Sequence, residues 1–277
     1  MLDGKAWPAL QRSAGMARLE MGAGPHGAQL RKLRQEGCAK VFLPKGAPGE
    51  AVFLNTSGGL TGGDRVSFNL ALAQGLDFAA TTQTAERAYA SAGGAAEMRV
   101  NFSVGAGSQL AWLPQETILY QDAHLNRVTD ISLAQGATLL TCETVILGRH
   151  AMREEPTNLV LQDLRRIHVA GRLFWSESVR LCQDTIQRKR GAALLGRARC
   201  FATLVMVGPG VEGAASALSP YLCAANCETA LSAWDGRLIL RLTAHHSWPL
   251  RCQIARILSQ LRGKPLPRVW QMNGDIE

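Results

Sequence analysis

The chain has 277 residues, 47% of them hydrophobic and 19% charged, with 30 Lys and Arg against 22 Asp and Glu and a formal charge of +8. This composition is typical of a globular protein with a sizeable core and argues against a disordered chain, while the positive charge suggests an acidic partner surface. No run approaches the roughly 20 apolar residues of a membrane span, and Asp3, Lys5 and Arg12 interrupt the apolar N-terminal stretch, unlike a signal peptide, so we expect a cytoplasmic protein that does not contact membranes.

Alternation of apolar and polar residues, the period of a half-buried strand, dominates the sequence. It is clearest where Met98, Val100, Phe102 and Val104 alternate with polar residues. We expect strands, in chain order, at residues 51–55, 66–72, 76–82, 98–104, 109–113, 125–133, 137–147, 158–169, 172–182 and 238–242. Glycine-containing turns separate them, and many short strands at this spacing predict a mainly β fold, either a sandwich or a solenoid of stacked sheets.

Helical periodicity is confined to the last third of the chain. Residues 211–233 are rich in Ala and Leu, although Pro220 interrupts them, and residues 249–261 carry one apolar face. Gly263 is expected to end the second helix. No linker-like stretch divides the chain, so we predict a single domain over residues 1–277.

A glycine-rich segment at residues 55–65, Asn-Thr-Ser-Gly-Gly-Leu-Thr-Gly-Gly-Asp-Arg, is the most unusual part of the sequence. Paired glycines allow positive φ angles and close approach to another backbone. A phosphate-binding loop would need a lysine after the last glycine and a helix next, whereas this segment has a carboxylate followed by a strand pattern. We therefore predict a structural or partner-binding loop formed by Gly58, Gly59, Gly62, Gly63, Asp64 and Arg65.

Four more segments have unusual composition. They are Thr-Thr-Gln-Thr-Ala-Glu-Arg-Ala-Tyr at residues 81–89, Trp-Leu-Pro-Gln-Glu-Thr-Ile-Leu-Tyr at 112–120, Glu-Thr-Val-Ile-Leu-Gly-Arg at 143–149 and Leu-Pro-Arg-Val-Trp at 266–270. Together with the glycine-rich segment, they resemble in type and order the motifs of the UreD (UreH) family of urease accessory proteins. The resemblance extends from Asn55 to Trp270, about four-fifths of the chain.

Three positions depart from the family pattern. The family usually has Ala-Met-Gly-Glu after the Gly-Arg of the fourth motif, and here Arg153 replaces the glycine. Ser57 and Ala90 also stand where other residues are usual. The arginine adds bulk and charge to a loop, so we expect the conformation of that loop to be affected.

The resemblance implies a stacked-sheet, solenoid-like fold, mainly β, with a few helices near the C-terminus. It also implies a chaperone-like scaffold that binds urease and the accessory protein UreF, and through UreF the nickel-carrying GTPase UreG. A water-filled tunnel through the protein is the expected route of nickel into the urease active site. The resemblance implies no catalytic activity and no cofactor, with nickel present only in transit, and no nucleic-acid partner.

Four glutamates are candidates for such a nickel route, because a dication in transit needs weak oxygen or imidazole ligands in series. Each lies in or beside a strand-like segment with apolar neighbours, where a solvated carboxylate is less expected. They are Glu86, Glu116, Glu143 and Glu177. The alternative for each is an ion pair, with Arg87, Arg149 and Arg180 nearby in the sequence.

Three other classes of function remain open. A hydrolase could combine Asp64, His124 or His150 with Ser57 or Ser91, although no Gly-x-Ser-x-Gly elbow is present. A nucleic-acid binder could use Arg188, Lys189 and Arg190, but aromatic residues make up only 6% of the chain.

A metalloenzyme is the third alternative. It could use His245 and His246, which would face opposite ways on a regular strand, or Cys223 and Cys227, which would share one face of a helix. No further Cys or His completes a four-ligand set around the two cysteines. The seven scattered cysteines instead favour reduced thiols, because an odd number cannot form a complete set of disulfides.

Overall fold

The computed structural model describes residues 11–47, 49–188, 191 and 194–271. It is mostly β, with 52% strand and 15% helix, in a stacked, solenoid-like arrangement, which confirms the predicted fold class. Residues 1–10, Lys189 and Arg190 lie outside the described part, so the structure does not test the expectation for the N-terminal stretch or most of the alternative nucleic-acid patch at residues 188–190. Within the described residues no helix is long and apolar enough to cross a membrane. The single domain stays a prediction.

One sheet has seven strands in the order β14-β13-β11-β8-β5-β1-β2. Its central strands β1, β5, β8, β11 and β13 run parallel, and β2 and β14 close its edges in antiparallel fashion. The strands are β1 (Ala14–Gly24), β2 (Gly27–Gly37), β5 (Arg65–Leu72), β8 (Ala96–Val104), β11 (His124–Leu133), β13 (Val160–Val169) and β14 (Arg172–Leu181). We call it sheet A.

The second sheet, sheet B, has ten strands, eight of them in the order β16-β17-β15-β12-β9-β6-β4-β3, while the short β7 and β10 continue from β12 on a side branch. Strands β4, β6, β9 and β12 are parallel. The strands are β3 (Ala39–Phe42), β4 (Glu50–Asn55), β6 (Asp77–Thr82), β7 (Glu86–Ala88), β9 (Gln109–Leu113), β10 (Thr117–Leu119), β12 (Thr138–Leu147), β15 (Cys200–Val207), β16 (Glu228–Trp234) and β17 (Arg237–Ala244).

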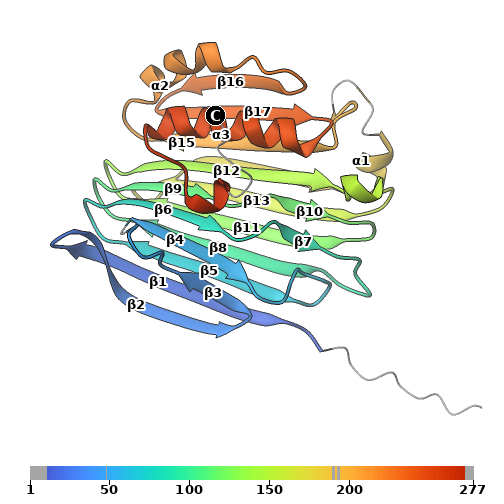
Figure 1. Ribbon diagram of the computed structural model, residues 1–277, viewed down its shortest axis with the longest axis horizontal. Helices are drawn as coiled ribbons and strands as arrows, with labels where there is room; N and C mark the ends of the chain where they lie inside the picture. Colours follow the sequence, from blue (N-terminus) through green and yellow to red (C-terminus); the bar gives the residue numbers. More distant parts are fainter. Residues whose placement is uncertain (1–10, 48, 189–190, 192–193, 272–277) are drawn as a thin grey trace, which may run out of the picture.

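From β4 to β13 the chain passes back and forth between the two sheets, with the short β7 and β10 added to sheet B after β6 and β9, and the coils stack, as Figure 1 shows. Alternating side chains of both sheets point into the space between them and form the main core. In the first coils this core is aromatic: Phe53 lies 5.1 Å from Phe68, and Phe102 lies 4.9 Å from Trp112, measured between ring centroids. Burial of these large rings holds the sheets together.

A second core lies on the outer face of sheet B, under helices α2 (Val211–Leu218) and α3 (Ser247–Arg262). Figure 1 shows α3 in front of β15 and β17. Strand β12 is therefore buried on both faces. Gly263 ends α3 in the left-handed conformation, as predicted, and the tail turns through η3 (Arg268–Trp270) back onto the sheet, where Trp270 Nε1 donates to the Leu113 carbonyl at 3.0 Å.

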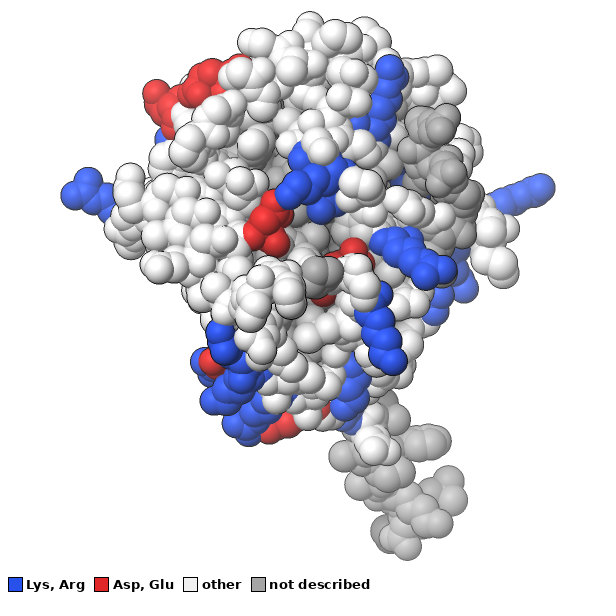
Figure 2. Space-filling model, turned by 60° about the vertical axis from the view of Figure 1, so that its left-hand side comes forward, with Lys and Arg blue, Asp and Glu red and all other residues white. Residues whose placement is uncertain are grey.

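Two segments differ from the sequence prediction. The predicted helix over residues 211–233 is wrong beyond Leu218, because the chain passes through η2 (Ser219–Tyr221), which contains Pro220, and then forms the edge strand β16. Strands β1 to β3 were not predicted. Strand β2 is exposed along nearly its whole length, so it has no buried face to create an alternation. Figure 2 shows basic side chains gathered over the lower part of the molecule. The hairpin of β1 and β2 carries exposed Arg18, Arg31, Lys32 and Arg34.

Two further short elements complete the described chain. Helix α1 (Gln183–Arg188) follows β14, and η1 (His150–Met152) follows β12. Strand β15, also missed by the sequence analysis, is an almost continuous apolar run, because sheet B has a core on each side of it.

Candidate functional site

The unusual sequence segments meet at one edge of sheet B, where its parallel strands end. Strands β4, β6, β9 and β12 end at Asn55, Thr82, Leu113 and Leu147, and the glycine-rich loop and the segments after β6 and β9 follow the first three directly. Behind this edge, β7 pairs with β10 and β10 with β12, so the segments stack in the same order as the coils. Four buried residues mark that stack: Leu60, Ala88, Leu119 and Leu147.

The glycine-rich loop packs tightly against the next coil. Gly59 has a φ of 147°, and a Cβ there would lie 2.7 Å from the Arg87 carbonyl oxygen, while a Cβ on Gly62 would lie 2.7 Å from that of Gly94. Asp64 is buried and accepts hydrogen bonds from the backbone of Ser13 at 2.7 Å and Thr61 at 2.9 Å. The loop is thus built around its own turn and the start of β1. Binding of a partner at this loop stays a prediction.

A cluster of charged side chains lies between the two sheets. Arg127 on β11 is only 3% exposed, and its Nε and Nη2 donate to both carboxylate oxygens of Asp163 on β13 at 2.9 and 2.7 Å. Its Nη1 lies 2.7 Å from Glu143 Oε2 on β12 of the opposite sheet. Arg165 on β13 continues the cluster, with Nη2 2.7 Å from Glu177 on β14. The ion pairs therefore cross from one sheet to the other.

The pKa values of the two carboxylates around Arg127 are shifted in opposite directions. Burial raises the pKa of Glu143, and Arg127 offsets this only in part. Burial acts on Asp163 in the same direction, but the paired hydrogen bonds and charge of Arg127 outweigh it and lower the pKa of Asp163. Glu143 Oε2 is close to Arg127, yet it accepts no aligned hydrogen bond from the described residues. Glu143 is thus the more readily protonated group and the freer ligand.

Glu86 does not form the predicted ion pair with Arg87, whose exposed side chain lies on the next position of β7. Its carboxylate instead accepts a hydrogen bond from Asn55 Nδ2 at 3.4 Å. Glu86 is partly exposed at the wall of a cavity but surrounded by protein, and this burial raises its pKa to about 7. At neutral pH the carboxyl group therefore exists in both its protonated and its ionised form.

The other two glutamates have cationic partners far away in the sequence. Glu177 contacts Arg165 and also Arg241 on β17, at 2.8 Å. Glu116 contacts Arg251 on α3, at 3.1 Å. Ion pairing with Arg149 and Arg180 is therefore wrong as a prediction; Arg149 pairs with Glu154 and lies 4.7 Å from the ring centre of Tyr120.

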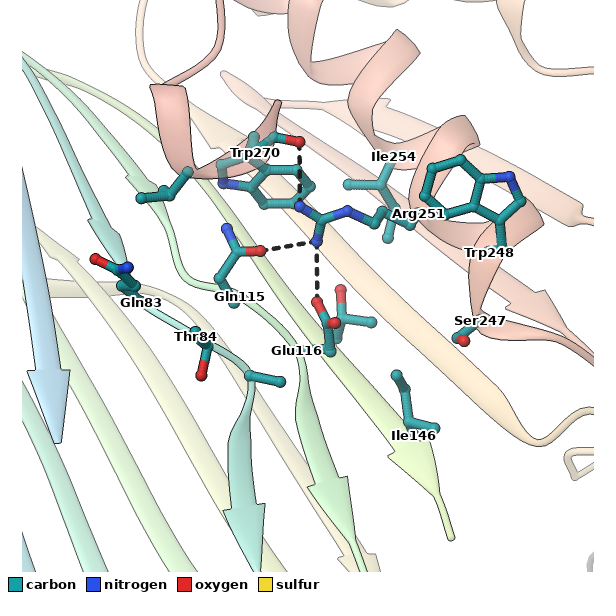
Figure 3. Close-up of a pocket in the computed structure, with 13 residues that line it drawn as sticks. Gln83, Thr84, Gln115, Glu116, Ile146, Ser247, Trp248, Arg251, Ile254 and Trp270 are labelled. Carbon is teal, nitrogen blue, oxygen red and sulfur yellow. Dashed lines mark hydrogen bonds and ion pairs between the residues drawn. The ribbon is translucent and has the colours of Figure 1, made fainter. Parts of the chain in front are cut away.

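Three hollows follow one another through this region. A groove of about 350 Å³ lies beside α3, between it and residues 83–85 and 115–116 (Figure 3). An interior cavity of about 60 Å³ shares residues 83–85 and Gln115 with the groove and contains Glu86, Arg127 and Glu143 in its wall. A third hollow of about 10 Å³ shares Glu143 with the second and is lined by Thr129, Thr141 and Arg165. Glu116, Glu86 and Glu143 line this series, whereas Glu177 lines none of the three hollows and contacts only Arg165 at the third.

Comparison with known proteins identifies the family. The model of the UreD urease accessory protein family matches residues 13–271. This chain belongs to the UreD family of urease accessory proteins. It is 49% identical over 264 residues to a urease accessory protein UreD of Cereibacter sphaeroides, covering 95% of this chain and 96% of that one. Proteins of the same name from Paracoccus denitrificans and Rhizobium leguminosarum are 43% identical over 274 residues and 38% identical over 265 residues; the matches cover 98% and 95% of this chain and 97% and 96% of the relatives.

The position at which this UreD-family chain departs from the Ala-Met-Gly-Glu motif has a distinct backbone conformation. Arg153 follows η1 with φ 54° and ψ 24°, in the left-handed region that favours glycine. Its side chain is exposed, so the added bulk meets solvent rather than the core. The expected effect on the loop is therefore limited to backbone strain at this one residue.

The alternative metal sites do not form as the sequence suggested. Cys223 and Cys227 lie in a loop between η2 and β16 instead of on a helix, so they share no helical face. His245 and His246 follow the end of β17, and there the two rings approach to 3.2 Å between Nδ1 and Nε2, so the prediction that they face opposite ways is wrong. Among the described residues of this UreD-family protein, no three His, Cys, Asp or Glu side chains are grouped to hold a metal ion.

Sequence reasoning missed Arg127, Asp163 and Arg165. Each occupies an inward position of its strand, in phase with inward apolar residues such as Leu125 and Ile167, although the outward neighbours Val128 and Leu164 are also apolar. A charged residue in the apolar phase of a strand is the signal that would have found them. Their pairing could not be found in this way, because Arg127 and Asp163 come together only through stacking of successive coils.

Proposed function

We propose that this protein is a non-catalytic scaffold for nickel delivery to urease. It binds apo-urease and UreF in the cytoplasm, and through UreF the GTPase UreG, and it passes nickel along the three hollows between α3 and the far side of the sheets. Nickel is its cargo, and the protein needs no cofactor of its own. The observation that carries this proposal is the charged cluster that lines consecutive hollows inside an otherwise apolar core.

The charges of the cluster suit a dication in transit. Moving Ni²⁺ through protein of low dielectric constant is costly unless carboxylates offset its charge. Glu86 and Glu143 face one cavity, and both have a raised pKa, so an arriving dication can displace a proton from either. When no dication is present, the ion pair with Arg127 neutralises the negative charge of Asp163. The path thus binds a dication weakly and releases it.

The hydroxyl groups suggested for hydrolysis are engaged elsewhere, which supports a non-catalytic role. Ser57 Oγ donates to Asn55 Oδ1 at 2.6 Å, and Ser91 Oγ donates to the Gly94 carbonyl at 2.7 Å. Asp64 accepts backbone N–H groups. No histidine activates either serine within the described residues. We accordingly expect the pure chain neither to bind nor to hydrolyse GTP.

The test compares carboxylate variants in assembly and in nickel delivery. Glu86→Gln and Glu143→Gln keep the shape of the side chain but remove its charge, and Arg127 retains Asp163 as a partner in both. Each variant should co-purify with UreF and apo-urease in wild-type yield and activate urease at least about tenfold more slowly. Glu36→Gln, on exposed β2, is the matched control and should behave as wild type. Wild-type activation by both interior variants would overturn the proposed path.

A further inference from the structure

The groove beside α3 and the interior cavity meet at Gln115. This side chain is 7% exposed and contributes to the walls of both hollows. Its Oε1 accepts a hydrogen bond from Arg251 Nη1 at 2.8 Å, and its Nε2 is buried without a hydrogen-bond partner among the described residues. Whatever holds Gln115 in place therefore controls the connection between groove and cavity.

Arg251 lines the groove beside Gln115, and Figure 3 shows that both of its terminal nitrogens are engaged, while its Nε is buried without a hydrogen-bond partner among the described residues. Besides Gln115, its Nη1 contacts Glu116 Oε2 at 3.1 Å, and its Nη2 donates to the Trp270 carbonyl at 3.2 Å. The guanidinium also lies 4.8 Å from the centre of the Trp270 ring. The side chain is 14% exposed. Contacts from α3, from the segment after β9 and from the tail thus keep one positive charge at the inner end of the groove.

A positive charge at this place opposes the entry of a second cation. Glu116 offsets part of the repulsion between Arg251 and a dication, but water screens the remainder less than at the open surface, because apolar side chains such as Ile146, Ile254 and Val269 wall the groove. The same guanidinium neutralises Glu116, the carboxylate nearest to the groove. In the arrangement described here, a dication in the groove meets neither a free carboxylate nor an open connection.

We propose that Arg251 is the positioning residue that closes the groove end of the interior path to divalent cations, and that residues 266–270 hold it in the closed position. Movement of the guanidinium away from Glu116 frees this carboxylate and the Gln115 amide toward the groove and so opens the path. Trp270 couples the tail to this movement, since its backbone carbonyl binds Arg251 while its indole is anchored on Leu113. The inference rests on the proposed nickel path.

The test measures how fast nickel leaves the protein. The purified complex of this chain with UreF is equilibrated with Ni²⁺, and release to an excess of a coloured chelator is followed in time. Arg251→Gln removes the charge and should accelerate release at least about tenfold, whereas Arg251→Lys retains the charge and should remain within about twofold of wild type. Arg256→Gln makes the same charge change on α3 beside Tyr221, outside the groove, and should have no effect.

The Glu143→Gln variant separates failure of this inference from failure of the proposed function. Glu143→Gln should lower the amount of nickel retained. If it does so while Arg251→Gln releases nickel at the wild-type rate, the path stands and the role of Arg251 is overturned. If Glu143→Gln retains the wild-type amount, nickel does not use the interior and both proposals fail. Equal acceleration by Arg251→Gln and Arg251→Lys would show that packing, not charge, closes the path and would also overturn the inference.

A second variant serves if Arg251→Gln does not fold. Trp270→Phe keeps a ring beside the guanidinium but loses the hydrogen bond to Leu113 that anchors the tail. It should accelerate release by about twofold to fivefold, in line with loss of one hydrogen bond worth about 1 kcal/mol. A wild-type rate for Trp270→Phe would contradict the role given to residues 266–270.

Discussion

The early and the late coils of this solenoid fill the same interior positions with opposite chemistry. Val66, Met98, Arg127 and Asp163 occupy equivalent, directly paired positions of β5, β8, β11 and β13, and the column begins apolar and ends ionic. The next inward column repeats the change in the order Phe68, Val100, Thr129 and Arg165. The backbone register is the same throughout, so only the side chains distinguish the two regions.

The difference between the coils indicates that buried ion pairs are not required to stabilise this fold, because apolar side chains fill the equivalent positions of the early coils. Burying two charges costs several kcal/mol per ion, and their attraction rarely returns more than well-packed apolar side chains would contribute. The early coils demonstrate that this backbone can be filled with Phe, Met and Val. The charged residues of the late coils are therefore consistent with the proposed transfer of a cation, which apolar side chains could not perform.

Removing the central cation is expected to have the largest effect. Arg127→Met leaves Asp163 and Glu143 buried near each other without the cation that both share, and should reduce the free energy of unfolding by about 3–5 kcal/mol or give insoluble protein. Replacing all three, in Arg127→Met, Glu143→Leu and Asp163→Leu together, imitates the early coils and should recover most of that stability while nickel delivery is lost. Denaturant unfolding measures the first effect, and a triple variant as unstable as Arg127→Met would refute the comparison.

A pH dependence of intermediate size is expected from Glu86. Its pKa in the folded state is raised to about 7 from 4.5, so the folded protein binds more protons than the unfolded chain between these values. The contribution of Glu86 to the free energy of unfolding is therefore largest near pH 4.5. It falls by about 2 kcal/mol as the pH rises to 7. Denaturant unfolding at pH 5 and pH 8 should show this loss in the wild type relative to Glu86→Gln. If the free energy of unfolding depends on pH in the same way in both proteins, burial does not raise the pKa of Glu86 and the prediction is wrong.

A smaller effect is expected in the apolar coils. Phe102→Leu keeps the core apolar but leaves space beside Phe53 and Trp112, which should cost about 1–2 kcal/mol. Once the lower yield is allowed for, the rate of urease activation should be that of the wild type. A specific loss of nickel delivery in this variant would show that the early coils also take part in transfer.

The smallest effect is expected on the outer face of the same strands. Arg166 on β13 pairs with Asp130 on β11 at 2.6 and 2.8 Å, but the two side chains are 40% and 27% exposed. Because water screens such pairs, Arg166→Gln should change stability by less than about 1 kcal/mol. Thermal unfolding would reveal the difference from Arg127→Met. If Arg166→Gln lost as much stability as Arg127→Met, burial would not explain the difference between the Arg166–Asp130 pair and the Arg127 cluster.

Alternation with one buried face was the clearest sequence signal, although β1 and β3 also carry buried residues and were missed. The alternation at residues 98–104 falls inside β8, while exposed β2 has none. Strand β16 escaped prediction for a related reason: its Ala-rich sequence has helical composition, and only pairing with β17 makes it a strand. The local alternation of apolar and polar residues indicates which face of a strand is buried, whereas the pairing of strands depends on residues elsewhere in the chain.

The glutamates of the candidate site were candidates from sequence, but their cationic partners and the assembly of the charged cluster were not. Apolar neighbours correctly marked Glu143 as buried, and it is 5% exposed. Its cation, Arg127, comes from the opposite sheet, and Glu116 finds Arg251 on a helix far along the chain. Nearby arginines were the natural candidates from sequence, yet coil stacking places other residues beside each glutamate.

The antiparallel edges of the solenoid also limit how far it can grow. A stack of parallel coils could be lengthened by another copy at either end, as happens in fibrous assemblies. Here β2 turns back along β1, and β3 along β4, so the next strand in line runs the wrong way for a parallel coil. Two copies meeting edge to edge through β2 would also bring Arg31, Lys32 and Arg34 against the same basic residues. The hairpin thus protects a protein made mostly of strands from polymerising with itself.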